Sequence, residues 1–264
     1  MFCLREPSRS CSRWGMERER RTALVIGASS PGGLGEATAR RLSDDGIEVI
    51  VAGRNVESLN RLASQIGGRA IACDIGDEAS IEALVAACGS IDIMINAAGT
   101  TMARSIVNLT RAAIEEQFAI HVTANLLLLK HAAPAMPAGG SIILFSSVTA
   151  RLAGAGLAAY ASAKAALDQV VRIAALEFGA RAIRVNAVAP GFSRTPMTES
   201  FLSNSHFDAL YRRESALGAL VTPEQVAATV AHLAADDCFI TGEIIQVSGG
   251  AQLCRLPRAD ELNG

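Results

Sequence analysis

The sequence has few aromatic residues, no excess of charge of either sign and no long apolar run. Phe, Trp and Tyr make up only 4% of the 264 residues, whereas 50% of the chain is hydrophobic and 23 residues are glycine. A core must therefore be built from Ala, Val, Leu and Ile. This apolar content excludes disorder for most of the chain, and the length fits a single α/β domain.

Basic and acidic residues nearly balance, 24 against 26, which gives a formal net charge of −2. Nucleic-acid-binding proteins usually carry a strongly basic domain or patch, so we expect no nucleic-acid partner. The leucines of residues 126–129 are flanked by Asn125 and Lys130, and no run of 18 apolar residues occurs. We therefore expect no membrane span.

The cysteines form no Cys-x-x-Cys pair and share no spacing with the four histidines. They are Cys3, Cys11, Cys73, Cys88, Cys238 and Cys254. A zinc site or a disulfide framework is not expected from this pattern. Free thiols are typical of a reducing compartment, so the sequence predicts a cytoplasmic protein with no metal site.

Residues 1–21 differ from the rest of the chain because they hold six arginines and no apolar segment. They lack the features of a secretory signal. A transit-like or anion-binding arm is one interpretation. The interpretation we favour is a disordered Arg-rich extension, or an upstream start with Met16 as the usual initiator, followed by one folded domain over residues 22–264.

Apolar runs typical of buried strands alternate with helical stretches along the folded part. The expected strands are residues 23–26, 47–52, 70–73, 91–95, 141–145, 183–189 and 243–247, and the expected helices are 36–42, 55–66, 78–87, 110–135, 157–178 and 223–235. This alternation predicts a Rossmann-like, doubly wound α/β domain with a seven-stranded parallel sheet and helices on both faces. Residues 192–222 resemble an insertion at the rim of a site.

A glycine-rich turn follows the first strand and precedes the first helix. It contains Gly27, Ser29, Ser30, Gly33, Leu34 and Gly35. Glycines let the backbone approach a pyrophosphate, and the helix N-terminus offers unpaired N–H groups. The turn therefore predicts a dinucleotide site, although a tight turn alone also needs glycine.

Arg54 stands where dinucleotide-binding chains often carry an acidic residue, at the tip of the second strand. A carboxylate there binds the ribose 2′-hydroxyl of NAD, whereas a guanidinium suits a 2′-phosphate. We therefore favour NADP(H) over NAD(H) as the cofactor. A solvated surface arginine is the alternative, because only two of the 24 basic residues are lysines.

One of these two lysines, Lys164, follows Tyr160 by four residues, so both lie on one helical face. A nearby ammonium lowers a tyrosine pKa from about 10 toward neutrality. Ser147 ends a buried strand, where ligand-facing groups of α/β sheets gather, and its hydroxyl could hold a substrate oxygen beside Tyr160.

These motifs occur in one order along the chain, together with Asn96-Ala97-Ala98-Gly99 and Pro190-Gly191. The combination, from about Thr22 to Ala251, resembles the short-chain dehydrogenase/reductase family. The resemblance implies that Tyr160 is the general acid/base, that Ser147 orients the carbonyl or alcohol oxygen, and that Lys164 binds the nicotinamide ribose and lowers the pKa of Tyr160.

The resemblance also implies a cofactor trough, an activity and an assembly. The trough would be formed by Asp74 and Ile75 near the adenine, by Asn96, Ala97, Ala98 and Gly99, and by Pro190, Gly191 and Thr195 near the nicotinamide. The activity would be hydride transfer between NADP(H) and a carbonyl or secondary alcohol, and the long helices would pair between subunits of a homodimer or homotetramer.

The candidate substrate-pocket residues beyond Ser147 and Tyr160 are Leu152, Phe192, Met197 and Phe201. Such an apolar wall suits 3-oxoacyl thioesters, ketosteroid-like molecules or small cyclic alcohols. A dinucleotide-binding sensor or scaffold with little turnover is a second hypothesis. An epimerase or dehydratase on the same fold is a third.

The chain departs from the family pattern at three places. Ile26 replaces the usual threonine before the first glycine, and Pro31-Gly32 lengthens the turn by two residues. The asparagine that completes the family's catalytic tetrad falls on His121, with Asn125 one helical turn later. In the family this position acts through its backbone carbonyl, a role that a histidine can keep. His121 is either merely tolerated at a helix kink or takes a direct catalytic part, and Asn125 is the second candidate for the tetrad position.

Overall fold

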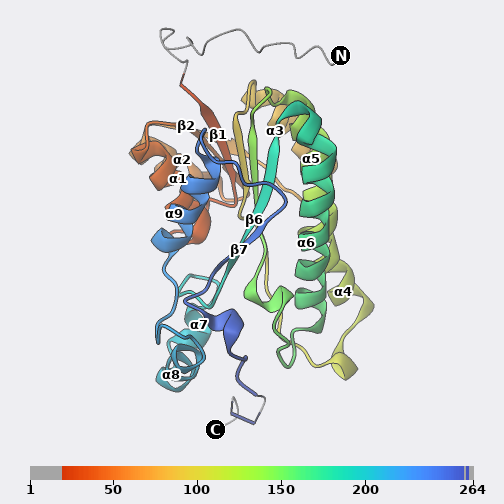
Figure 1. Ribbon diagram of the computed structural model, residues 1–264, viewed down its shortest axis with the longest axis vertical. Coiled ribbons are helices and arrows are strands. Elements are labelled where there is room, and N and C mark those ends of the chain that lie inside the picture. Colours follow the sequence, from red (N-terminus) through yellow and green to blue (C-terminus); the bar gives the residue numbers. More distant parts are fainter. Residues whose placement is uncertain (1–19, 259, 262–264) are drawn as a thin grey trace, which may run out of the picture.

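The computed structural model describes residues 20–258, 260 and 261. One parallel sheet of seven strands lies between two layers of helices, in the order β3-β2-β1-β4-β5-β6-β7 (Figure 1). The strands are β1 Thr22–Ile26, β2 Glu48–Gly53, β3 Arg69–Ala72, β4 Ile93–Asn96, β5 Ser141–Phe145, β6 Arg184–Pro190 and β7 Ile244–Val247. The predicted fold class is confirmed.

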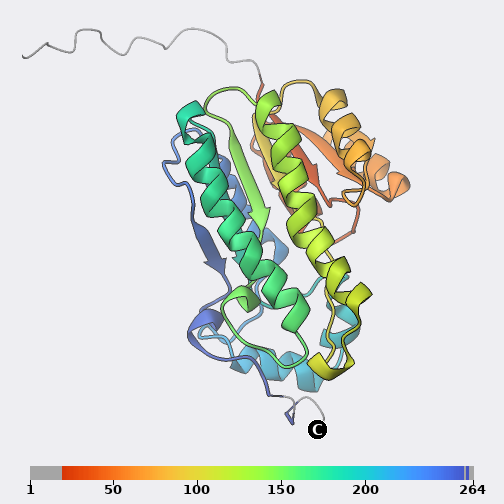
Figure 2. The same cartoon turned by 90° about the vertical axis from the view of Figure 1, so that its right-hand side faces the viewer.

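Helices cover both faces of the sheet. They are α1 Leu34–Asp44, α2 Val56–Ile66, α3 Glu78–Cys88, α4 Arg111–Phe118, α5 Ala124–Ala135, α6 Ala158–Phe178, α7 Glu199–Leu202, α8 Ser205–Arg213 and α9 Pro223–Ala234. Side chains of α1, α2 and α9 form one apolar layer, and those of α3, α5 and α6 form the other. Figure 2 shows α5 and α6 running side by side across one face.

The central strands are apolar on both faces because each is covered by helices. Every residue of β4 and β5 is buried, and Leu24, Ile95 and Ile143 have no exposed surface. Side chains of a strand alternate between the two faces, so a doubly covered strand needs continuous apolar sequence. This explains why continuous runs located the strands to within two residues.

The predicted helix over residues 110–135 is wrong in one respect, because it is not continuous. A π-helical turn, η2 (Ala119–Thr123), separates α4 from α5. Such a turn holds one extra residue and frees main-chain groups that an α-helix would pair. The amide of Asn125 donates to the main-chain oxygen of His121 at 2.9 Å and so satisfies one of these groups.

The start of the described chain is held against the domain. Arg21 donates to the main-chain oxygen of Ala234 at 2.7 Å and lies 2.9 Å from the carboxylate of Asp236. Most of the predicted extension of residues 1–21 lies outside the described residues, as do Cys3 and Cys11. The four described cysteines are free.

None of the helices in the described part of the chain is long and apolar enough to cross a membrane. The same residues contain no group of His, Cys, Asp and Glu side chains arranged to hold a metal ion.

Candidate active site

A cavity of about 350 Å³ opens at the carboxyl ends of the strands, where the order reverses between β1 and β4. Ligands of doubly wound sheets bind at this point, because the loops after neighbouring strands diverge there. The cavity brings together these predicted residues: Leu34, Ala97, Ala98, Gly99, His121, Ser147, Tyr160, Lys164, Pro190, Gly191, Phe192, Thr195, Met197 and Phe201. Residues more than 150 positions apart in the sequence, such as Leu34 and Phe201, therefore line the same cavity.

Tyr160 and Lys164 lie in the first two turns of α6 and face the cavity together. Lys164 is only 4% exposed, and its Nζ donates to the main-chain oxygen of Phe145 at 2.6 Å. The same Nζ lies 5.8 Å from the centre of the Tyr160 ring. The end of β5 thus fixes the lysine beside the tyrosine.

The electrostatics of this pair differ from the sequence expectation. Burial lowers the pKa of Lys164 to about 7, an effect that the carboxylate of Asp168 opposes. Burial raises the pKa of Tyr160, and the hydroxyl of Ser147 opposes that rise. The expected lowering of the Tyr160 pKa is therefore not what the structure shows, because the loss of water around the phenol outweighs the effect of the Ser147 hydroxyl.

Ser147 follows β5 and caps the short helix η3 (Val148–Ala150). Its Oγ accepts hydrogen bonds from the main-chain N–H of Thr149 at 3.2 Å and from the Thr149 hydroxyl at 2.9 Å. Because a serine oxygen has two lone pairs, these contacts leave its own O–H free to donate. Ser147 is thus oriented as a donor toward an oxygen beside Tyr160.

His121 lies in the π-helical turn, 1% exposed, with its ring edge-on to Tyr160 at a centroid distance of 5.3 Å. Its Nε2 is 2.9 Å from the main-chain oxygen of Thr100, so Nε2 carries the proton. Nδ1 is buried without a hydrogen-bond partner. Burial and the charge of Lys164 lower the pKa of His121 to about 3, and the imidazole is therefore neutral.

A hydrogen-bonded chain joins this turn to the end of β4. The amide of Asn96 donates to the side-chain oxygen of Asn125 at 2.9 Å, and Asn125 donates to the main-chain oxygen of His121 at 2.9 Å. Both asparagines are buried. The side-chain oxygen of Asn96 accepts from the N–H of Ala98 at 3.1 Å, so the chain also shapes the loop that lines the cavity.

The main chain of the glycine turn is packed so closely that two of its positions leave no room for a side chain. A Cβ on Gly27, which has φ +84°, would lie 2.4 Å from the N atom of Ala98, and a Cβ on Gly35 would lie 2.4 Å from the oxygen of Gly27. Gly33 caps α1 without a side-chain hydrogen bond, which leaves the first N–H groups of the helix for an anion. The two added residues, Pro31 and Gly32, are exposed.

Nine of the residues predicted to bind the dinucleotide lie outside the cavity itself. They are Gly27, Ser29, Ser30, Gly33, Gly35, Arg54, Asp74, Ile75 and Asn96. A Cβ on Gly53 would lie 3.1 Å from the Oγ of Ser29, so the tip of β2 adjoins the turn, and Arg54 is exposed there.

The predicted pair Asp74 and Ile75 lies after β3. The carboxylate of Asp74 accepts from the N–H of Gly76 at 2.9 Å. Ile75 packs in the core, so only its main chain could meet an adenine ring. A contact of this pair with adenine would therefore use the exposed Asp74 side chain or the main chain.

The substrate end of the cavity is mostly apolar, as expected, but the residues that line it differ in part from those predicted. Phe192, Met197 and Phe201 line it, whereas Leu152 does not. Sequence reasoning missed Tyr211, Leu256 and Pro257, which also line it. A signal for Tyr211 was present, because Phe207 and Tyr211 are four residues apart on one face of α8. No local signal pointed to Leu256 or Pro257.

Comparison with known proteins agrees with this geometry. A family model described as enoyl-(acyl carrier protein) reductase matches residues 27–252. The chain is 35% identical over 242 residues to the cis-4-hydroxycyclohexanecarboxylate dehydrogenase of Sinomonas cyclohexanicum, covering 87% of this chain and 96% of that protein. It is 33% identical over 249 residues to the mitochondrial (−)-isopiperitenol/(−)-carveol dehydrogenase of Mentha piperita, covering 88% and 93% of the two chains.

A solved structure shows the same fold. A variant actinorhodin polyketide ketoreductase, crystallised with NADPH, has a TM-score of 0.82 and 26% identity, covering 88% of this chain and 97% of that one. The family model spans most of the chain, and the relatives are dehydrogenases of the same length. This protein therefore belongs to the short-chain dehydrogenase/reductase family and is an oxidoreductase that acts on alcohol or ketone groups with a nicotinamide cofactor.

Proposed function

We propose that this protein transfers hydride between NADP(H) and a carbonyl or secondary alcohol on an apolar substrate. The observation that carries the proposal is the shared wall formed by Ser147, Tyr160 and Lys164 beside an apolar substrate end. When bound, the nicotinamide supplies the hydride in reduction and accepts it in oxidation.

The side chains divide the remaining work. In reduction the hydroxyl of Ser147 donates to the substrate oxygen and holds it next to Tyr160. Tyr160 gives its proton to that oxygen as negative charge develops, and its raised pKa keeps it protonated for this step. Lys164, held by the oxygen of Phe145, binds the ribose hydroxyls and supplies positive charge below its pKa of about 7.

We propose that His121 holds neighbouring groups in place and does not exchange a proton. Its main-chain oxygen is held by Asn125, and its ring packs on Tyr160. A neutral imidazole with a pKa of about 3 is neither an acid nor an effective base at neutral pH. The ring instead orients the phenol of Tyr160.

The preference for NADP(H) is supported by Arg54 at the tip of β2 and by the NADPH with which the similar ketoreductase was crystallised. In Arg54→Ala we expect the dissociation constant for NADPH to rise at least tenfold, because a hydrogen bond to a charged group contributes about 1.5–3 kcal/mol. The constant for NADH should hardly change. Arg61→Ala, which removes an exposed arginine of α2, is the matched control. An equal loss of affinity for both cofactors would exclude the assignment of Arg54 to the 2′-phosphate.

The substrate class is supported by two relatives whose names specify cyclic secondary alcohols. We propose small cyclic ketones and 3-oxoacyl thioesters as the substrates to test first. Oxidation of NADPH, followed by its absorbance, should reveal turnover with at least one of them. Tight NADPH binding without turnover of any carbonyl compound would instead support a low-turnover sensor, the alternative favoured by His121 at the tetrad position.

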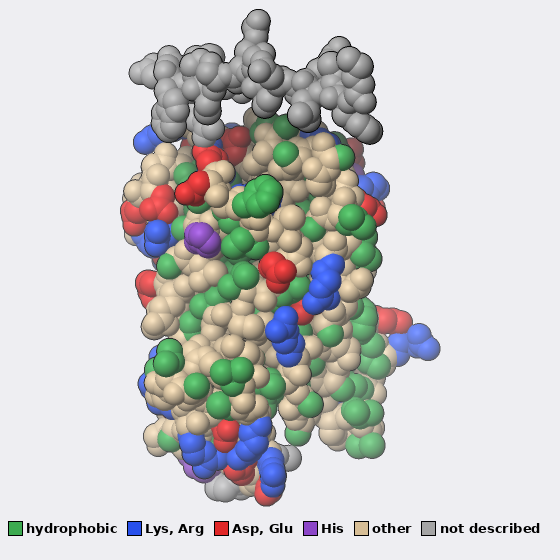
Figure 3. Space-filling view, viewed as in Figure 1, with side chains coloured by type: hydrophobic (Ala, Val, Ile, Leu, Met, Phe, Trp, Pro, Cys, Tyr) green, Lys and Arg blue, Asp and Glu red, His purple; other side chains and the backbone are tan. Residues whose placement is uncertain are grey.

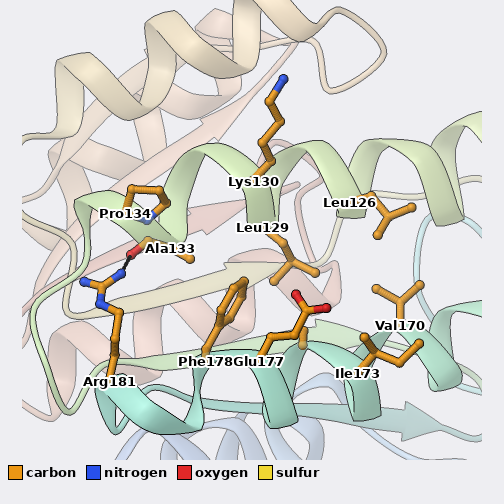
Figure 4. A pocket seen from close by; sticks show the side chains of 11 residues that line it. Leu126, Leu129, Lys130, Ala133, Pro134, Val170, Ile173, Glu177, Phe178 and Arg181 are labelled. Carbon is orange, nitrogen blue, oxygen red and sulfur yellow. Dashed lines mark hydrogen bonds between the residues drawn. The ribbon is translucent and has the colours of Figure 1, made fainter.

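The outer face of α5 and α6 supports a homodimer or homotetramer. A hollow of about 450 Å³ lies between the two helices, lined by Leu126, Val170 and Ile173 among others (Figure 4). Leu176, on α6, is 83% exposed. If this face pairs with a second copy, Leu176→Glu should shift the protein to a smaller species in analytical ultracentrifugation, whereas an unchanged mass would place the interface elsewhere.

We also propose that the folded domain begins near residue 22 and that the protein is cytoplasmic. The described chain from β1 onward forms one continuous sheet, which supports the domain boundary. The free cysteines support a reducing compartment.

A further inference from the structure

The segment after the short helix η5 (Ala251–Leu253) runs along the substrate end of the cavity. We call residues 255–261 the strap, of which residue 259 is not described. Leu256 and Pro257 line the cavity, and Leu256 is 8% exposed. The strap is therefore part of the wall that faces the substrate.

Leu256 reaches across to the loop that precedes the catalytic helix α6. A Cβ on Gly154 would lie 2.7 Å from Cδ1 of Leu256 and 2.8 Å from Cδ1 of Leu157. Both leucines thus pack on the same glycine, in the loop just before α6. This contact joins the strap to the opposite wall of the cavity.

The other walls near the strap are aromatic. Phe192 and Tyr211 stack with ring centres 3.6 Å apart, and Phe201 meets Tyr211 at 5.5 Å. Lys164 is the one Lys, Arg, Asp or Glu among the described residues that line the cavity, and it lies beside Tyr160. The aromatic side chains and Leu256 therefore favour an uncharged, apolar group at this end.

Glu261 holds the strap on α8. Its carboxylate lies 2.6 and 2.8 Å from the guanidinium of Arg255 and 3.0 Å from that of Arg213, and it accepts from the N–H of Arg258 at 2.7 Å. Its main-chain oxygen is 2.9 Å from Nε2 of His206. These partners hold the pKa of Glu261 far below its usual range.

Arg255 extends the cluster to Glu214, at 3.0 Å. Basic and acidic side chains are gathered at this end of the molecule, below α7 (Figure 3). Isolated surface ion pairs contribute little, but a network with two-pronged arginine contacts can fix a segment. The cluster clamps the strap at its far end while Leu256 packs at the near end.

We propose that Leu256 determines which apolar group the cavity accepts, and that Glu261 positions it by clamping the strap to α8. This inference rests on the proposed reductase function for its substrate readout. The selected group is an uncharged ring or chain next to the reacting carbonyl, bounded by the aromatic side chains and the strap.

The test compares Leu256→Ala, Glu261→Gln and the control Asp260→Asn, which makes the same charge change one residue away. In Leu256→Ala we expect the ratio of kcat/KM for a bulky ketone to that for a small one to rise at least tenfold, as pocket volume determines such discrimination. In Glu261→Gln we expect KM for the small ketone to rise severalfold with kcat unchanged. Asp260→Asn should match the wild type.

A second readout does not depend on turnover. Hydrogen exchange of the main-chain N–H groups of Arg255, Leu256 and Arg258 should be at least tenfold faster in Glu261→Gln, and 1 M salt should accelerate it in the wild type but not in that variant. Glu261→Asp should restore part of the protection. Unchanged exchange in Glu261→Gln would overturn the clamp, and an unchanged substrate ratio in Leu256→Ala would overturn the selection.

The outcomes separate this inference from the proposed function. If the wild type reduces no ketone, the proposed function fails, and the exchange experiment still decides whether Glu261 clamps the strap. If Leu256→Ala does not fold, Leu256→Val tests the same point, with an expected ratio between those of the wild type and a fully opened pocket. An unchanged ratio in that variant overturns the selection.

Discussion

Two long helical stretches carry the chemistry, and they are built differently. α6 runs without interruption for 21 residues and presents Tyr160 and Lys164 four residues apart. The stretch from α4 to α5 is broken by the π-helical turn that carries His121. The four-residue spacing on α6 places Tyr160 and Lys164 on one face, and the end of β5 then holds the lysine. The position of His121 depends instead on the contact of Asn125 with Asn96 on β4. The variants below probe this difference.

The largest expected effect concerns α6. Tyr160→Phe keeps the ring and its packing on His121 but removes the proton donor. Turnover should fall by about 10²-fold or more, because positioned general acids contribute 10²–10⁴-fold, while NADPH affinity stays within a factor of about 3. Steady-state kinetics and titration of the cofactor measure the two quantities. A turnover near that of the wild type would remove Tyr160 from the mechanism.

The second prediction concerns Lys164, because burial of its charged amine destabilises the folded protein. In Lys164→Met the free energy of unfolding at pH 7 should rise by about 2 kcal/mol, because each unit of a pKa shift corresponds to about 1.4 kcal/mol and part is offset by the lost bond to Phe145. Chemical denaturation measures the free energy of unfolding of both proteins.

The pH dependence of that difference has a definite sign. The folded pKa of Lys164, about 7, lies below that of an unfolded lysine. Between these values the unfolded chain binds more protons, so raising the pH stabilises the wild type. The advantage of Lys164→Met should therefore shrink as the pH rises toward about 10. An advantage that grows with pH would contradict the assignment.

The third prediction concerns the broken helix. Asn125→Leu leaves the amide of Asn96 and the main-chain oxygen of His121 without their partner. Unfolding free energy should fall by about 1–3 kcal/mol, the cost of buried unsatisfied groups. Thr123→Ala, at an exposed position of the same turn, should change it by less than about 0.5 kcal/mol. Equal losses in both variants would show that the asparagine chain does not hold the turn.

The smallest expected effect concerns His121. His121→Asn should retain most of the activity, and the pH dependence of kcat/KM should be the same in both proteins, since burial lowers the histidine pKa to about 3 and removes it from the range near 6.5. A limb near 6.5 in the wild type that disappears in the variant would make the imidazole a proton relay.

Sequence patterns predicted the sheet and the catalytic wall because both follow from local signals. Continuous apolar runs mark buried strands, and four-residue spacing on a helix places Tyr160 beside Lys164. The form of the break, a π-helical turn, was not predicted. The contact of Asn125 with Asn96 on β4 beside that turn joins segments that are distant in the sequence, and a local pattern does not reveal it.

The substrate wall was predicted only in part for a similar reason. Phe192 and Phe201 follow a strand end within the predicted insertion, whereas Leu256 reaches the cavity through a segment beyond the last strand. The raised pKa of Tyr160 was missed because spacing reveals a neighbouring charge but not the loss of water around the phenol.

The strand order also dictates how the sheet can assemble. Within the described sheet, consecutive strands pair from β1 to β2 to β3 and from β4 to β7, and only the pairing of β1 with β4 joins strands that are not consecutive in the chain. As the chain leaves the ribosome, residues 22–72 can form one half of the sheet before β4 exists. Pairing of Ala23 with Ile93 then closes a loop of some 70 residues. That closure creates the crevice for the cofactor, so we expect it to be the slow step of folding.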